Sequence, residues 1–386
     1  MTIALKVFDI PDVLALIIGG LVLNILIDVN SLVTDFQGLE SVITELALAY
    51  IGYKIGNEID FEVLRKKGRK FGVVLLGEAL GAFILIALGM FLLTHKLGLS
   101  LLLGSIGMAT APAATTLVLS QYKAQGEMTQ AILFIIAFDD TMAILFVDLS
   151  LGFIIHEGEA LYLLIPEIIY EISLEIFLSV LGGLIGLLII YLLLKLNIMT
   201  KKSSIEWIYG TALMLIGLSL AGHVNTILIL FVWGIGISVL EKHFSQLEEQ
   251  MEKIEILSIP ILYLFFILVG LLMDLDKLLE FATLILAVAY TVSRGIGKGI
   301  GSYLSSSVSN LSTHVKNNLP FSLLTQAGVA IGLSSLSYHR LLELHHPEDA
   351  DLVINIIGIS IVITEILALY LVKKAIFRSG EATKNS

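Results

Sequence analysis

The chain has 386 residues, of which 57% are hydrophobic and only 15% are charged, and its mean hydropathy is +0.94. Ordinary soluble domains carry roughly 25% charged residues, so this composition excludes a soluble globular protein and indicates a chain that crosses a membrane several times. There is no cysteine, which excludes disulfides and cysteine metal sites. The formal net charge of −11 gives no sign of nucleic-acid binding.

The N-terminal segment, "MTIALKVFDIP", lacks the basic start, apolar stretch and small-residue cleavage site of a secretory signal. We therefore expect the whole chain to be mature. No linker rich in proline, glycine or serine separates soluble modules. Residues 1–386 are predicted to form a single transmembrane unit without a soluble regulatory domain.

Twelve apolar runs are candidates for crossing a hydrocarbon core of about 30 Å. They cover approximately residues 13–27, 39–55, 71–93, 97–119, 128–149, 172–194, 205–220, 227–240, 256–273, 281–304, 319–336 and 352–372. The first, seventh and eighth runs are shorter than the ~20 residues of a straight span, so these spans would have to include flanking polar residues. Barrel strands have only about 10 alternating residues. The predicted fold class is therefore an all-α membrane protein of about 12 transmembrane helices.

Basic residues predict the orientation of these helices. If the N-terminus is cytoplasmic, 17 of the 23 Lys and Arg residues lie in cytoplasmic segments and 3 lie in external loops. Cytoplasmic loops of membrane proteins are enriched in Lys and Arg. The distribution therefore favours twelve spans with both termini in the cytoplasm, and we expect the host to be a prokaryotic inner membrane.

Two of the predicted helices are expected to be interrupted near their centres. The fourth contains "MATAPAATTLVLS", where Pro112 removes a helical hydrogen bond among small residues. The eleventh contains "LLTQAGVAIGLSS", with Gly328 and Gly332 in a similarly small centre. Because the two spans are seven apart, a repeat that relates them would be inverted in the membrane. Many transporters use inverted repeats whose two discontinuous helices meet near the midplane, and we expect two crossed, discontinuous helices here.

The offset between the two interruptions is 216 residues, from position 112 to position 328. The same offset places Glu78 opposite Arg294 in the repeat. It also places Asp139 opposite Asn355. Two alternatives remain for Glu78: it pairs with Arg294 and holds two helices together, or it lies against solvent in an aqueous funnel.

Adjacent acidic residues, Asp139 and Asp140, lie inside the apolar run "AILFIIAFDDTMAILFVDL". An ionised Asp at a helix centre costs roughly 2.5–3.5 kcal/mol on insertion scales. One alternative is structural: a protonated Asp bonded to Thr141 or to a neighbouring helix. Adjacent helical residues diverge by about 100°, so one such contact cannot serve both. The functional alternative is that one carboxylate binds a monovalent cation while a counter-charge holds the other, so that cations and protons compete for the same oxygens.

A counter-charge is available in the tenth predicted span, "AYTVSRGIGKGIGSYL", where Arg294 and Lys298 are four residues apart on one helical face. Lys suits a switchable role better than Arg, because Arg keeps its charge when it is buried. The alternative for both residues is that they extend along the helix to the cytoplasmic interface.

These segments resemble a known family. "GMATAPAATTLVLSQ", "AFDDTMAI", "RGIGKGIG" and "QAGVAIGL" look like the monovalent cation:proton antiporters, in the sodium/proton exchanger branch related to the glutathione-gated potassium efflux systems. The resemblance covers nearly the whole chain. It implies a core domain of approximately residues 69–150 and 278–374, dimerisation or scaffold helices of approximately residues 12–57 and 205–274, a homodimer, and elevator-like alternating access.

The resemblance also assigns roles to residues. It implies that Asp140 is the ion-binding carboxylate and that Asp139 is its partner. Lys298 would pair with Asp139, while Thr110 and Pro112 would mark the unwound part of the fourth helix. The implied activity is electrogenic exchange of Na⁺, or alternatively Li⁺ or K⁺, for protons across the lipid bilayer, with no cofactor.

Two departures from the family pattern affect these expectations. Many members carry a Glu in the eleventh helix where this chain has Gly328, and Gln326 nearby could supply a neutral carbonyl ligand. The chain also ends where the potassium efflux systems continue into a nucleotide-binding domain, which argues against ligand gating and favours sodium over potassium.

Other classes of function remain to be weighed. A symporter, or a channel-like potassium efflux pathway, could use the same inverted-repeat architecture. An intramembrane aspartyl protease needs two acids that face each other from different helices. Adjacent Asp139 and Asp140 cannot do that, so we expect a transporter and no enzyme.

Overall fold

The computed structural model describes residues 12–26, 29–57, 61–111, 115, 118–119, 122–155, 161–200, 203–222, 224–273 and 280–382. In these ranges every regular element is a helix. The predicted all-α class is therefore confirmed. The chain divides into two compact units: the first is Met1–Leu23, Asp60–Gly158 and Val269–Ser386, and the second is Asn24–Ile59 and Glu159–Leu268.

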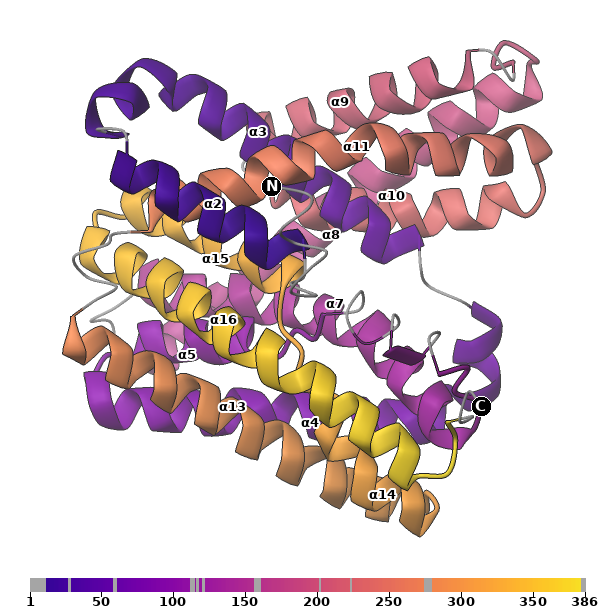
Figure 1. Ribbon diagram of the computed structural model, residues 1–386. Helices are drawn as coiled ribbons and strands as arrows, with labels where there is room; N and C mark the ends of the chain where they lie inside the picture. Colours follow the sequence, from indigo (N-terminus) through magenta and orange to yellow (C-terminus); the bar gives the residue numbers. More distant parts are fainter. Residues whose placement is uncertain are drawn as a thin grey trace. The chain divides into compact units, whose positions relative to one another are not determined.

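The first unit contains most of the helices that concern the site (Figure 1). They are α4 (Phe61–Thr94), α5 (Leu97–Ile106), α7 (Glu127–Ile155), α13 (Phe281–Val308), α14 (Thr313–Asn318), the short 3-10 helix η1 (Leu319–Phe321), α15 (Gly328–Glu343) and α16 (Pro347–Arg378). In this unit α13 packs against both α4 and α16, and α5 packs against α4 and α7.

The second unit is built around α10. Its helices are α3 (Val29–Asn57), α8 (Leu161–Lys195), α9 (Ser204–Gly222), α10 (Thr226–Glu241) and most of α11 (Ser245–Leu272), while α2 (Asp12–Leu26) divides between the units. Glycines let α3 and α10 touch through their backbones: a Cβ on Gly56 would lie 2.1 Å from the carbonyl oxygen of Phe231. Small residues at such contacts are typical of helix pairs in membranes.

Each of the twelve predicted apolar runs overlaps a helix of the structure. By length and hydropathy alone, three segments of the described chain could cross a membrane: Gly68–Thr94, Ser173–Lys195 and Ser204–Gly222. The bent pair Pro347–Glu365 and Tyr370–Arg378 would make a fourth. The total of twelve spans therefore stays a prediction.

Helices α4 and α13 approach each other through glycines. A Cβ on Gly301 would lie 2.1 Å from the carbonyl oxygen of Gly77, and a Cβ on Gly297 would lie 2.5 Å from that of Gly81. Real side chains never come so close to a backbone. Only glycine allows this packing, and it brings the backbone of Glu78 against α13, since a Cβ on Gly301 would lie 3.1 Å from the Cα of Glu78.

The N-terminus of α7 is capped by a residue distant in sequence. The carboxylate of Glu381 accepts hydrogen bonds from the backbone N–H groups of Met128 (2.7 Å) and Thr129 (2.8 Å). Glu127 accepts one from Lys70 (2.5 Å) and one from the backbone N–H of Ser312 (3.2 Å). Partial burial alone would raise the pKa of Glu127, but these hydrogen bonds outweigh it and the pKa is lowered. Helix α7 is thus fixed at the end that precedes Asp139 and Asp140.

The contact between α4 and α13 gives a testable prediction. Replacing Gly301 by Ala forces the two backbones apart, and overpacking of this kind typically costs ~1–3 kcal/mol. We expect a lower midpoint of thermal unfolding in detergent for Gly301→Ala. The matched control is Gly299→Ala on the same helix, where a Cβ has no heavy atom within 4 Å. Equal midpoints for the two variants would contradict the close packing.

Candidate functional site

Helix α5 ends in the middle of the fourth predicted span. It stops at Ile106, and residues 107–111 are not helical. Pro112, which marked the predicted interruption, lies outside the described residues. Thr110 lies in the non-helical stretch and is 1% exposed. The carbonyl groups at the end of α5 therefore need partners from outside the helix.

A second non-helical stretch precedes α15. Residues 322–327 follow η1 and are not helical, and α15 begins at Gly328. The sequence predicted this interruption within "LLTQAGVAIGLSS", whose first five residues lie in the non-helical stretch, whereas Gly328 and Gly332, which marked its centre, lie within α15. The non-helical stretch comes before the glycines because its backbone groups form hydrogen bonds with residues distant in sequence.

The two non-helical stretches are hydrogen-bonded to each other. The backbone N–H of Ala111 donates to the carbonyl of Thr325 (3.1 Å), and the Thr325 hydroxyl donates to the carbonyl of Ala111 (3.1 Å). The hydroxyls of Thr115 and Thr325 are 3.0 Å apart. Segments more than 200 residues apart in sequence thus meet in the buried centre of the first unit.

Arg294 binds the carbonyl groups of both stretches. Its guanidinium donates to Gly107 (3.0 Å) and Ala109 (2.7 Å) at the end of α5. It also donates to Leu324 (2.7 Å) and Thr325 (3.1 Å) before α15. A positive charge at the C-terminus of α5 is also favoured by the helix dipole. Arg294 is 1% exposed, so its interactions are with protein groups and it does not extend to the membrane interface.

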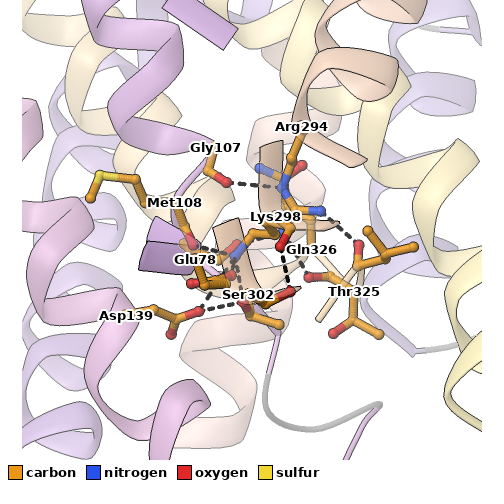
Figure 2. Close-up of polar contacts among 12 residues, drawn as sticks. Glu78, Gly107, Met108, Asp139, Arg294, Lys298, Ser302, Thr325 and Gln326 are labelled. Atoms are coloured by element: carbon orange, nitrogen blue, oxygen red, sulfur yellow. Dashed lines mark hydrogen bonds and ion pairs between the residues drawn. The ribbon is translucent and has the colours of Figure 1, made fainter. Parts of the chain in front are cut away.

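Lys298 binds Glu78, and not Asp139, as its closest charged partner. Its Nζ donates to Glu78 Oε1, to the carbonyl of Met108 (2.6 Å) and to the hydroxyl of Thr110 (2.8 Å). Asp139 Oδ2 lies 3.7 Å away. Figure 2 shows Glu78, Met108 and Asp139 around the end of the Lys298 side chain. Lys298 is fully buried, which excludes the alternative that it reaches the interface.

The position of Glu78 corrects both alternatives from the sequence. It is fully buried, so it does not face a solvent funnel, and its ion pair is with Lys298 instead of Arg294. The physical reason is that backbone carbonyls already occupy the Arg294 guanidinium. The glycine contact between α4 and α13 brings Glu78 beside Lys298, which lies about one helical turn from Gly301.

Asp139 and Asp140 lie on α7 and are both buried, at 0% and 1% exposure. The Thr110 hydroxyl donates to Asp139 Oδ2 and accepts from Lys298. It therefore links the ammonium group to the aspartate. Asp139 Oδ1 has no hydrogen-bond partner among the described residues. An unpaired carboxylate oxygen in an apolar interior is costly, so it is available to a proton or a cation.

Gln326 connects three helices to the second break. Its Nε2 donates to the Tyr290 hydroxyl (2.8 Å) and weakly to the carbonyl of Ile106 (3.5 Å). The Ser360 hydroxyl donates to Gln326 Oε1 (3.3 Å) and accepts from Thr291 (3.0 Å). Gln326 thus holds α5, α13 and α16 together, and its carbonyl oxygen is already engaged. Gly328, the other position where the family pattern departs, only begins α15.

The sequence reasoning overlooked one buried acid. Glu365 on α16 is 2% exposed, and neither of its oxygens has a hydrogen-bond partner in the part of the chain that the structure describes. The signal was present, because Glu365 is a lone acid within the apolar run 352–372. Asn355 is similarly buried without side-chain partners among the described residues. Its relation to Asp139 stays a prediction from the repeat.

Comparisons with known proteins place this chain in a family. Residues 1–373 match the family model described as "Sodium/hydrogen exchanger, transmembrane". The chain belongs to the sodium/hydrogen exchanger family. The exchanger is therefore an integral membrane transporter that couples cations to protons, and it is not an enzyme. The resemblance inferred from the motifs is confirmed.

Solved structures show the same fold for the exchanger. One match is the sodium proton antiporter MjNhaP1 from Methanocaldococcus jannaschii at pH 8, with a TM-score of 0.71 and 16% identity over 97% of this chain and 94% of that chain. At this identity the likeness concerns the fold alone. A comparison with curated proteins gives no match.

Thr110 gives a prediction for this site. Thr110→Val keeps the shape of the side chain but removes the group that accepts from Lys298 and donates to Asp139. Leaving buried polar groups unpaired typically costs ~1–3 kcal/mol, so we expect about a tenfold or larger loss of transport rate in proteoliposomes. Thr110→Ser retains the hydroxyl and should keep most of the rate. Equal losses in the two variants would show that the hydroxyl is not the important group.

Proposed function

We propose that the exchanger moves Na⁺ in exchange for protons, with Asp140 as the main cation ligand and Asp139 as the second carboxylate. The observation that carries this proposal is the adjacent pair of buried carboxylates beside two non-helical stretches of backbone. Carboxylate and carbonyl oxygens suit a hard monovalent cation. Li⁺ and K⁺ accept the same ligands, so they are the alternative substrates, with potassium efflux as the alternative function.

A count of buried charges supports competition between the cation and protons. Glu78, Asp139 and Asp140 are three carboxylates, and Arg294 and Lys298 are two cationic groups, all at most 1% exposed. Glu365 has no partner for a charge among the described residues, so we count it as protonated. With the other groups ionised, one negative charge is left over. Burying an uncompensated charge is expensive, and either a monovalent cation or a proton on an aspartate removes it.

The exchange proposed is electrogenic. The resemblance to antiporters with an adjacent acidic pair supports this, because that pair implies more protons than cations per cycle. Each cycle would then transfer net charge. Since the cation and the protons occupy the same oxygens in turn, neither can be carried together with the other.

The movement proposed is elevator-like. The first unit holds all the buried charges named above, which supports a role as the moving core domain, and the second unit would serve as scaffold and as the surface of a homodimer. The breaks at residues 107–111 and 322–327 support an inverted repeat with two crossed, discontinuous helices. We further propose twelve spans with both termini in the cytoplasm of a prokaryotic cell, and a role in pH homeostasis.

The central test uses purified exchanger in proteoliposomes with an imposed pH gradient and a pH-sensitive dye. Addition of Na⁺ should dissipate the gradient, and Asp140→Asn should abolish this response, because an amide carries no charge for the cation. Asp148→Asn on the same helix, about two turns away and half-buried, is the matched control and should keep transport. A series with Li⁺ and K⁺ decides the preferred cation. Persistent Na⁺ transport by Asp140→Asn would refute the proposal.

A further inference from the structure

The Lys298 ammonium has three protons, and all three are engaged without Asp139. They are donated to Glu78 Oε1, to the carbonyl of Met108 and to the hydroxyl of Thr110. Asp139 Oδ2 is at 3.7 Å, beyond the usual length of a hydrogen bond. Lys298 and Glu78 are both at 0% exposure. They form an ion pair within the buried cluster, in which Glu78 Oε2 has no hydrogen-bond partner among the described residues.

Asp139 accepts no hydrogen bond from Lys298, although the ammonium lies 3.7 Å from Asp139 Oδ2 and forms a longer ion pair with it. Its Oδ2 accepts from Thr110, and its Oδ1 has no partner among the described residues. The negative charge of Asp139 is therefore not required to satisfy the ammonium. A cation that approaches Asp139 does not have to break a hydrogen bond to Lys298.

Glu78 is held in place by the backbone. Gly77 and Gly81 on α4 touch Gly297 and Gly301 on α13, so α4 cannot slide or rotate against α13 without a clash. Lys298 lies on the same stretch of α13 as these glycines. The distance between the carboxylate and the ammonium is thus fixed by packing and does not depend on side-chain flexibility alone.

We propose that Glu78 is a positioning residue that holds the Lys298 ammonium and so keeps it from displacing the cation at Asp139. This inference rests on the proposed antiport. It gives Glu78 the role of fixing the distance between the Lys298 ammonium and Asp139.

Removal of the Glu78 charge has a defined consequence. In Glu78→Gln the ammonium loses its only directly bonded carboxylate, and the nearest remaining acid is Asp139. Lys298 would turn towards Asp139 and compete with Na⁺ for it. Competition of this kind weakens cation binding but leaves the fully loaded carrier unchanged, so it affects KM and not kcat.

The test measures Na⁺ KM and kcat in proteoliposomes at one pH. We expect Glu78→Gln to raise KM about tenfold, within the coupling range of groups in one hydrogen-bond network, with kcat within about twofold of wild type. The double variant Glu78→Gln with Lys298→Gln removes the competing ammonium as well. Its KM should return to within about twofold of wild type.

The double-mutant comparison separates this role from a structural one. If Glu78→Gln raises KM by the same factor whether residue 298 is Lys or Gln, Glu78 does not act through Lys298 and the inference is wrong. A loss of kcat at unchanged KM would overturn it equally. Should Glu78→Gln fail to fold, Glu78→Asp replaces it: a carboxylate withdrawn by one methylene must raise KM part of the way, and an unchanged KM overturns the inference.

The outcomes also distinguish the inference from the proposed function. If the wild-type protein exchanges no Na⁺, Li⁺ or K⁺ for protons, the antiport proposal fails before Glu78 is considered. If the wild type transports and Asp140→Asn does not, the antiport proposal stands, and the Glu78 variants then decide the role of Glu78 alone.

Discussion

The first unit depends on the hydrogen bonds from the Arg294 guanidinium to carbonyl groups of two non-helical stretches, residues 107–111 and 322–327. Without Arg294, the carbonyls of Gly107, Ala109, Leu324 and Thr325 would be left in an apolar interior. Each such loss costs several kcal/mol where no water is available. Non-helical backbone at this depth is tolerated only where the protein itself satisfies it. The buried arginine is thus what permits polar, non-helical stretches beside Asp139.

This requirement fixes the partners of the other charges. An arginine that binds four carbonyls is not available to a carboxylate, and this leaves Lys298 as the cation for Glu78. The glycines of α4 and α13 bring these two side chains together. Asp139 is then an acid that accepts no hydrogen bond from either of these cations. The constraints run from the backbone carbonyls to Arg294, from Arg294 to the pair of Lys298 and Glu78, and from that pair to the surroundings of Asp139.

Much of this architecture could be predicted from the sequence. Hydrophobic runs locate helices because a bilayer requires internally satisfied backbone, and an adjacent acidic pair in such a run is too costly to lack a function. The choice of partner could not be predicted. Arg294 and Lys298 lie on one helical face, and which of them meets Glu78 depends on contacts between glycines and on carbonyl groups whose positions no side-chain pattern records.

The centre of the second break was misplaced for a related reason. Gly328 and Gly332 suggested a weak helix, yet both are helical, while "FSLLTQA" before them contains the unwound residues. Tertiary hydrogen bonds from Arg294 and Ala111 decide that position, and local propensity does not. Glu365 was not among the predicted residues, although a lone acid in an apolar run carries the same physical signal.

The neutral amide at Gln326 follows from the same balance of charge. A glutamate there would add another buried carboxylate to Glu78, Asp139 and Asp140, and burying an uncompensated charge is expensive. Gln326 instead donates to Tyr290 and accepts from Ser360 without adding charge. The polar contacts between α5, α13 and α16 are kept, and no further charge is added to the buried cluster.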